Sequence, residues 1–115
     1  MTLRPQDRVV LDLVVDDTFG LWEVVWRLTT ALGKTLGSPL EIAKDSVHRL
    51  RDGGLVELLV REWADDDPVP IAESGREVDL SLDSTWDEPA PDGAEVLVTA
   101  TDFGRFRLWE SEAQT

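Results

Sequence analysis

Apolar residues recur every three or four positions in three stretches of the first 52 residues. This spacing places them on one face of a helix and is typical of helices that pack against a core. We therefore predict helices over residues 5–15, 21–32 and 39–52. The first stretch is rich in β-branched residues and would also suit a strand. We favour a helix because the next two stretches read as a helix pair.

The third helix has the best-defined ends. Ser38 and Glu41 have the spacing of a capping box, and Pro39 occupies the first helical position. The Gly53-Gly54 pair can supply the left-handed residue that ends a helix. Four apolar residues between these ends predict a buried stripe: Leu40, Ala43, Val47 and Leu50.

The second helix carries two neighbouring apolar stripes. Gly20 is its predicted N-cap, because Glu23 can then reach back to free backbone N–H groups. One stripe is expected in the core: Leu21, Val25, Leu28 and Leu32. Trp22 and Trp26 form the other stripe, and two interpretations of it stay open. Large aromatic residues dominate small cores, but they are also enriched where a partner or a second copy binds.

The second half of the chain reads as two strands joined by a long segment. Residues 55–63 are apolar on both faces, which predicts a strand covered on both sides, and residues 95–101 read as its partner. Between them, Val78, Leu80 and Leu82 alternate like a short strand, while a helical turn leading to Trp86 fits nearly as well.

A last helix is predicted to begin at Thr101, whose hydroxyl can cap it. This helix carries three aromatic residues: Phe103, Phe106 and Trp109. We predict a single domain over residues 1–110 and a frayed tail over 111–115.

Two stretches resemble winged-helix regulators of the MarR and PadR type. V-H-R-L-R-D-G-G-L-V-E-L is similar to the end of their recognition helix and the strand after it. V-L-V-T-A-T-D-F-G-R-F-R-L is similar to the segment that closes their wing and starts the next helix. The resemblance implies an α+β, winged-helix-like fold, with three N-terminal helices, a β-hairpin wing and a short C-terminal helix. It also implies DNA binding, with the helix at 39–52 in the major groove.

The chain departs from this family in the length and charge of its wing. Residues 65–95, which we call the inserted segment, form a long acidic insertion between the two predicted strands. They hold 11 acidic residues and one basic residue, Arg76, and so account for −10 of the net charge of −13. Such a segment repels polyphosphate and favours a basic partner.

The predicted recognition helix is also poorly charged for DNA. At about 100° per residue, the face opposite its buried stripe carries these residues: Glu41, Asp45, His48, Arg49 and Asp52. DNA-reading helices usually offer Arg, Lys, Asn or Gln to bases and phosphates. Lys44 and Arg51 flank the buried stripe, where their aliphatic stems can lie along apolar surface.

The residue types present in the chain do not favour a catalytic function. The chain has no cysteine and one histidine, His48, so thiolate sites, histidine metal clusters and Ser-His-Asp triads cannot be built. Asp65, Asp66 and Asp67 lack the spacing of a calcium loop and read as a solvated acidic loop. We expect no enzyme activity, no cofactor and no metal.

We therefore predict a small acidic winged-helix-like protein that acts through protein–protein contacts, as an adaptor or regulator or by mimicking nucleic-acid charge. The partner is expected to be a basic protein surface or a second copy, giving a homodimer. The alternative is a DNA-binding transcriptional regulator that uses arginines such as Arg49, Arg51 and Arg61. A third possibility is a small-ligand sensor with a Trp-lined pocket.

The candidate partner-binding residues are Trp22, Trp26, Glu41, Asp45, Arg49, Asp65, Asp66 and Asp67. No apolar run approaches the length of a membrane span, about 18 residues or more. The N-terminus has no secretory pattern, so we expect a cytoplasmic protein.

Overall fold

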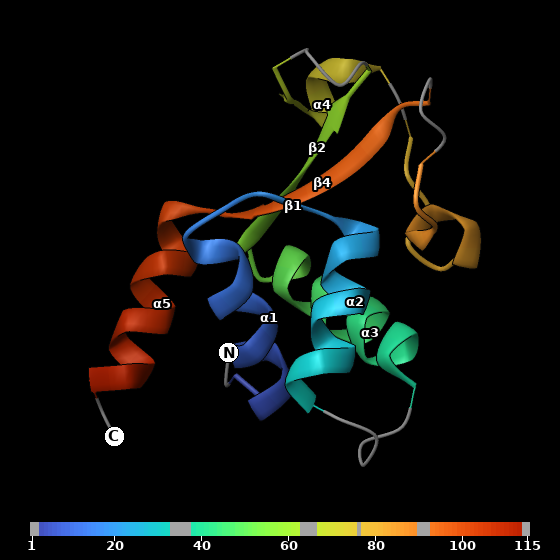
Figure 1. Ribbon diagram of the computed structural model, residues 1–115. Helices are drawn as coiled ribbons and strands as arrows, with labels where there is room; N and C mark the ends of the chain where they lie inside the picture. Colours follow the sequence, from blue (N-terminus) through green and yellow to red (C-terminus); the bar gives the residue numbers. More distant parts are fainter. Residues whose placement is uncertain (1–2, 33–37, 63–66, 76, 90–92, 114–115) are drawn as a thin grey trace.

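A computed structural model describes residues 3–32, 38–62, 67–75, 77–89 and 93–113 (Figure 1). The fold is α+β. Its α-helices are α1 (Pro5–Val15), α2 (Leu21–Leu32), α3 (Pro39–Asp52), α4 (Ile71–Ser74) and α5 (Asp102–Ala113), with a 3₁₀ turn, η1 (Asp83–Trp86). Its strands are β1 (Phe19–Gly20), β2 (Val56–Arg61), β3 (Val69–Pro70) and β4 (Glu95–Ala100). The predicted long helices and the two main strands are confirmed.

The capping residues explain where the helices begin. The Ser38 hydroxyl oxygen accepts from the Glu41 backbone N–H at 3.5 Å, the first half of the predicted capping box. Glu41 directs its carboxylate toward Lys44, at 4.0 Å, in place of the reciprocal cap contact. Gly20 donates its N–H to Glu23 at 3.3 Å, as expected for the start of α2. At the end of α3, Gly54 has φ 77°, the left-handed conformation that glycine adopts most easily.

The three N-terminal helices pack together beneath the sheet (Figure 1). Val10, Leu11 and Val14 of α1 are fully buried and meet the inward faces of α2 and α3. The predicted stripe of α3 is confirmed, because Ala43, Val47 and Leu50 are completely inaccessible and Leu40 packs against them. In α2 the buried side is centred on Val24 as well as Leu21 and Leu28.

The sheet is antiparallel, with strand order β1-β4-β2-β3. The central pair, β2 and β4, aligns Leu58 with Val98 and Arg61 with Glu95. On the other side of β4, Phe19 of β1 pairs with the same Val98. Sequence patterns did not predict β1 or β3, because two residues are too few to show an alternation.

The inserted segment folds back on the domain. Its described parts contain β3, α4 and η1, and three of its residues, Ile71, Leu80 and Trp86, join the main core. The Trp86 indole N–H donates to the Leu80 carbonyl at 2.9 Å, which requires the chain to reverse between them. Of the two predicted alternatives, the helical turn leading to Trp86 is confirmed, and the short strand over Val78–Leu82 does not form.

The C-terminal helix begins as predicted. Thr101 accepts from the Gly104 N–H at 3.0 Å and donates to the Gly54 carbonyl at 2.7 Å, which ties α5 to the end of α3. The helix continues to Ala113, into the segment 111–115 that we predict to fray. Within the described part of the chain, none of the helices combines the length and apolarity needed to cross a bilayer.

Candidate functional site

The outward face of α3 is the surface that would bind a protein partner or DNA in the two predicted functions. Its exposed side chains are Glu41, Asp45, His48, Arg51 and Asp52. Three of these five are acids. His48 Nε2 lies 3.3 Å from an Asp52 carboxylate oxygen, so even the histidine faces an acid.

Arg49 does not project from this face. Its guanidinium turns back to Asp7 of α1, with Nη2 2.5 Å from one carboxylate oxygen and Nε 3.3 Å from the other. A third donor, Nη1, contacts Asp45 at 2.6 Å. These contacts, first of all that with Asp7, raise the pKa of Arg49. The side chain is 22% exposed, and its donors are committed to carboxylates of this chain.

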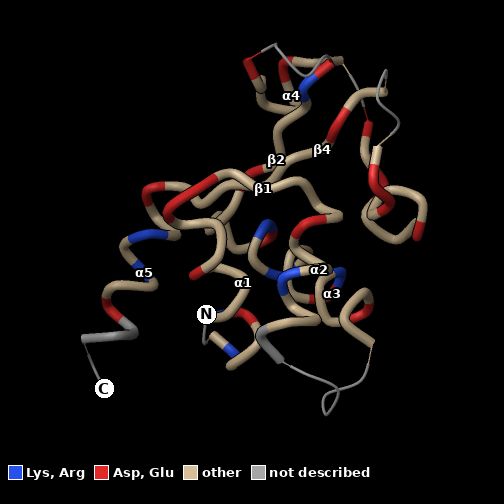
Figure 2. Tube along the Cα trace, in the orientation of Figure 1, with Lys and Arg blue, Asp and Glu red and all other residues tan. Residues whose placement is uncertain are grey.

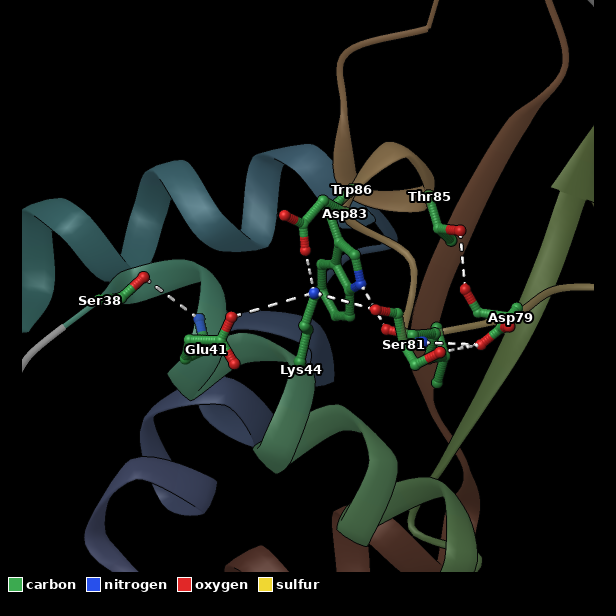
Figure 3. Close-up of polar contacts among 9 residues, drawn as sticks. Ser38, Glu41, Lys44, Asp79, Ser81, Asp83, Thr85 and Trp86 are labelled. Atoms are coloured by element: carbon green, nitrogen blue, oxygen red, sulfur yellow. Dashed lines mark hydrogen bonds and ion pairs between the residues drawn. The ribbon is translucent and has the colours of Figure 1, made fainter.

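Lys44 is held by the inserted segment (Figure 3). Its ammonium group bonds to the Asp83 carboxylate and donates to the Ser81 carbonyl at 3.1 Å. The hydrogen bond to Asp83 raises the pKa of Lys44 above its ordinary value of 10.5. The loop is braced by Asp79, whose pKa is lowered by hydrogen bonds from the Ser81 hydroxyl, at 2.6 Å, and the Ser81 backbone N–H. Lys44 therefore serves as the anchor of the inserted segment on α3.

A groove lies between the helices and the inserted segment. It has a volume of about 800 Å³ and passes Trp22 of α2, His48 and Arg51 of α3, and the chain from 77 to 89. Five acidic residues line it: Glu77, Asp79, Asp87, Glu88 and Glu95. The electrostatic character of the groove is therefore acidic, with Arg51 as the cation on its α3 side.

The two candidate tryptophans behave differently, so neither interpretation holds for both. Trp22 is half-buried at the groove, where its indole N–H donates to Glu95 at 3.1 Å. Glu95 also receives the Arg61 guanidinium at 2.5 Å. Trp26 is 61% exposed. The guanidinium carbon of Arg27 lies over the Trp26 ring, 5.4 Å from the ring centroid.

Only one residue of the aspartate run is described by the structure. Asp67 is exposed beside β3, while Asp65 and Asp66 fall outside the described residues. Among the residues that the structure describes, no group of His, Asp or Glu side chains is arranged to hold a metal ion. Of the predicted site residues, Glu41, Asp45 and Arg49 lie on α3, whereas Trp22 lies in the groove, where α3 contributes His48 and Arg51.

Sequence reasoning missed the carboxylates that neutralise the cations of α3. Asp7 could have been found, because it precedes Val10, Leu11 and Val14 at helical spacing and so lies on a buried stripe. A carboxylate in such a position needs a cationic partner. Asp83 carried no comparable signal, since it acts through a contact between distant segments, and the same holds for Glu95, which binds Arg61 of β2.

Comparison of the chain with protein-family models, with curated proteins and with solved structures found no match.

Proposed function

We propose that this protein is a small winged-helix-like adaptor or regulator that acts through protein–protein contacts. In this proposal the outward face of α3 and the acidic groove beside it receive a basic surface of another protein. A surface of this kind can also compete with nucleic acid for that partner, which is how a charge mimic works.

The winged-helix part of the proposal is supported by the order of elements. Three helices are followed by the antiparallel pair β2–β4 and a C-terminal helix, and β1 joins the sheet from between α1 and α2. This corresponds to a helical domain with a two-stranded wing in which α3 takes the place of the recognition helix. The inserted segment then extends the wing and folds over one edge of α3.

The functional part of the proposal rests on one observation: two cations of α3 are bound by carboxylates of the same chain. Lys44 is bound by Asp83 and Arg49 by Asp7, so neither is free to bind phosphate. The acids exposed on this face are Glu41, Asp45 and Asp52, of which Asp45 is bound by Arg49. DNA binding gains its salt-dependent affinity by neutralising phosphates with free Lys and Arg. Here that contribution would be repulsive, whereas a basic protein surface would be attracted.

The test compares capture of protein partners by two charge variants. The wild-type chain, as bait in native lysate with and without nuclease, should retain a basic partner after nuclease treatment. The variant Glu41→Gln/Asp52→Asn/Asp87→Asn/Glu88→Gln removes four carboxylates from α3 and the groove and should lose that partner. The control Asp12→Asn/Asp16→Asn removes exposed carboxylates from the α1 region and should retain it.

Salt gives a second criterion, because attraction between opposite charges is screened within about 10 Å at 0.1 M salt. Capture should therefore weaken steeply as salt rises. Recovery of DNA together with loss of every protein partner after nuclease would contradict the proposal.

A second candidate function is DNA-binding transcriptional regulation, favoured by the element order and by the exposed Arg51 beside His48. It predicts a shift of promoter DNA in a gel at low salt that Arg51→Ala abolishes. The matched control is Arg27→Ala, which removes an exposed arginine from α2. Absence of any shift at low salt would rule this candidate out.

A further inference from the structure

The sheet has an open edge beside the start of β4. On the outer side of this strand, β1 pairs with Leu97 and Val98. The chain then leaves the sheet at Leu21, where α2 begins, so within the described chain no strand pairs with Glu95 or Val96 on that side. In agreement with this, Val96 is half-buried whereas Leu97 and Val98 are buried.

An open strand edge offers backbone hydrogen bonds to a ligand. Successive residues of a strand turn their N–H and C=O groups to opposite sides, so one residue of the pair Glu95 and Val96 directs both groups away from β2. An exposed edge of this kind is a template for pairing with another chain. Extended peptides bind such edges by adding a strand to the sheet. The edge therefore suits a ligand with an extended backbone.

The acidic groove lies along this edge. Its lining includes Ala94, Glu95 and Val96, together with Trp22 of α2 and residues between 77 and 89 of the inserted segment. Figure 1 shows this part of the inserted segment beside the start of β4. The groove volume of about 800 Å³ is within the range of about 300–1,000 Å³ that is usual for ligand sites. A short extended segment therefore has room to lie in the groove against β4.

Charge indicates which segment fits. Five acids line the groove, against Arg51 and His48. Within the described chain, no cation is paired with Glu77, Asp87 or Glu88, and all three acids are exposed. Figure 2 shows acidic positions both in the inserted segment and at the start of β4. A segment that carries cations would complement this charge.

The apolar part of the lining favours arginine over lysine. Trp22 is half-buried, and its indole N–H donates to Glu95 at 3.1 Å, so an aromatic ring and a carboxylate lie together in the groove. Leu82 of the same lining is 53% exposed. A guanidinium stacks on aromatic rings and binds carboxylates in a planar fork, which a lysine ammonium cannot do.

We infer that the groove binds an extended, arginine-containing segment of a partner protein, which adds as a strand to β4 at Glu95 and Val96. Alternate side chains of such a strand point to opposite faces, so one set can reach Trp22 and the groove acids. The inference rests on the proposed function, because it specifies the form in which a basic partner is recognised. It differs from a contact of charge alone because the backbone of the partner takes part.

Fluorescence anisotropy with a labelled synthetic peptide of alternating Arg and Thr tests the inference, because Thr favours strands and Arg supplies the charge. The wild-type chain should bind this peptide at low salt and should not bind one of alternating Glu and Thr. Asp87→Asn/Glu88→Gln should weaken binding by about fivefold, as expected for the loss of two exposed ion pairs. The control Asp12→Asn/Asp16→Asn also removes two exposed carboxylates, from the α1 region, and should bind like the wild type.

Methylation of the peptide backbone separates strand addition from attraction by charge. One version of the peptide carries N-methyl groups on every Arg, and the other carries them on every Thr. A strand added to β4 directs only one of these two sets of N–H groups toward the edge. One version should therefore bind about tenfold more weakly than the other, as expected for the loss of more than one hydrogen bond. Amide exchange at Glu95 or Val96 should also slow when the unmodified peptide binds.

The outcomes distinguish this inference from the proposed function. Equal binding of the two methylated peptides would overturn strand addition, as would failure of the wild-type chain to bind the peptide of alternating Arg and Thr. Either result leaves the proposed function intact if a basic partner is still captured from lysate. Failure of that capture contradicts the proposed function itself.

Discussion

The guanidinium of Arg49 holds both carboxylate oxygens of Asp7, a fully buried residue 42 positions earlier in the chain. Asp7 also accepts the Arg4 backbone N–H at 3.2 Å, so the same carboxylate caps α1 and joins it to α3. The contact gives Arg49 a structural role at a position where a DNA-reading helix would present a free cation.

Replacing Arg49 by Met should destabilise the fold, because it leaves the Asp7 carboxylate buried without its partner. Breaking a buried pair typically costs about 3–5 kcal/mol. Since Arg49 is itself partly exposed, we expect about 3 kcal/mol in urea unfolding. Arg51→Met is the control and should change stability by less than about 0.5 kcal/mol, because Arg51 is exposed.

The double variant Asp7→Asn/Arg49→Met tests whether Arg49 stabilises the fold by neutralising the buried Asp7 carboxylate. It removes the unpaired charge and should recover part of the lost stability. Equal unfolding midpoints for Arg49→Met and Arg51→Met would show that the buried pair does not hold α1 to α3.

Docking of the inserted segment should depend on pH at both extremes. The bond to Asp83 raises the pKa of Lys44 above 10.5. The Lys44–Asp83 pair therefore stabilises the docked segment fully below pH 10.5, and this stabilisation is lost as pH rises through the raised pKa. Hydrogen bonds from Ser81 lower the pKa of Asp79 below 3.8. These bonds therefore stabilise the docked segment fully above pH 3.8, and this stabilisation is lost as pH falls through the lowered pKa. Carbon-13 NMR shifts of the Asp79, Ser81 and Asp83 side chains, recorded over a pH series, measure both transitions.

Lys44→Met should remove the alkaline transition while leaving the acid one. The matched control is Arg51→Met, which also removes a cation from α3 but contacts neither Asp83 nor Ser81 in the described interactions. An alkaline transition that persists in Lys44→Met would show that Lys44 is not the anchor.

Trp86→Ala should release the inserted segment while the three-helix core stays folded. Trp86 is 4% exposed, and its indole N–H bonds to Leu80 within the same segment. Truncating a buried tryptophan typically costs about 3–5 kcal/mol, which we expect to appear as local opening. Amide exchange should rise over residues 77–89 and remain slow in α1 and β4. Equal acceleration in all elements would mean that the segment is an integral part of the core.

Gly104→Ala should displace α5 from the sheet. An alanine Cβ at this position would overlap the Leu55 backbone carbonyl oxygen, and backbone cannot move aside as a flexible side chain can. Overpacking of this kind costs about 1–3 kcal/mol, so a thermal melt should show clear destabilisation.

The control for this variant is Gly75→Ala. Gly75 has φ 74° and open space around it, so alanine meets strain there but no clash. We expect a cost of about 1–2 kcal/mol for the left-handed backbone and no change in the packing of α5. Retention of α5 packing in Gly104→Ala, seen by hydrogen exchange, would contradict the close approach.

Local sequence patterns were sufficient to predict the main helices and strands. The three long helices, the β2–β4 pair and the cap at Thr101 follow from periodicity and turn chemistry within stretches of about 10 residues. The concentration of acid in residues 65–95 was equally plain. The predicted face of α3 was correct for Glu41, Asp45, His48 and Asp52 but not for Arg49. Periodicity gives the direction in which a residue leaves its helix but does not show where a long side chain ends.

Which charged side chains stay available depends on contacts between segments that are distant in the sequence. Asp7 meets Arg49 across 42 positions, Asp83 meets Lys44 across 39, and Glu95 meets Trp22 across 73. Contacts over such separations leave no local pattern, because they depend on how complete elements pack. The same packing separated Trp22, half-buried at the groove, from Trp26, exposed to solvent. Local chemistry fixed the helices and strands, while long-range packing determined which of their side chains remain available for binding.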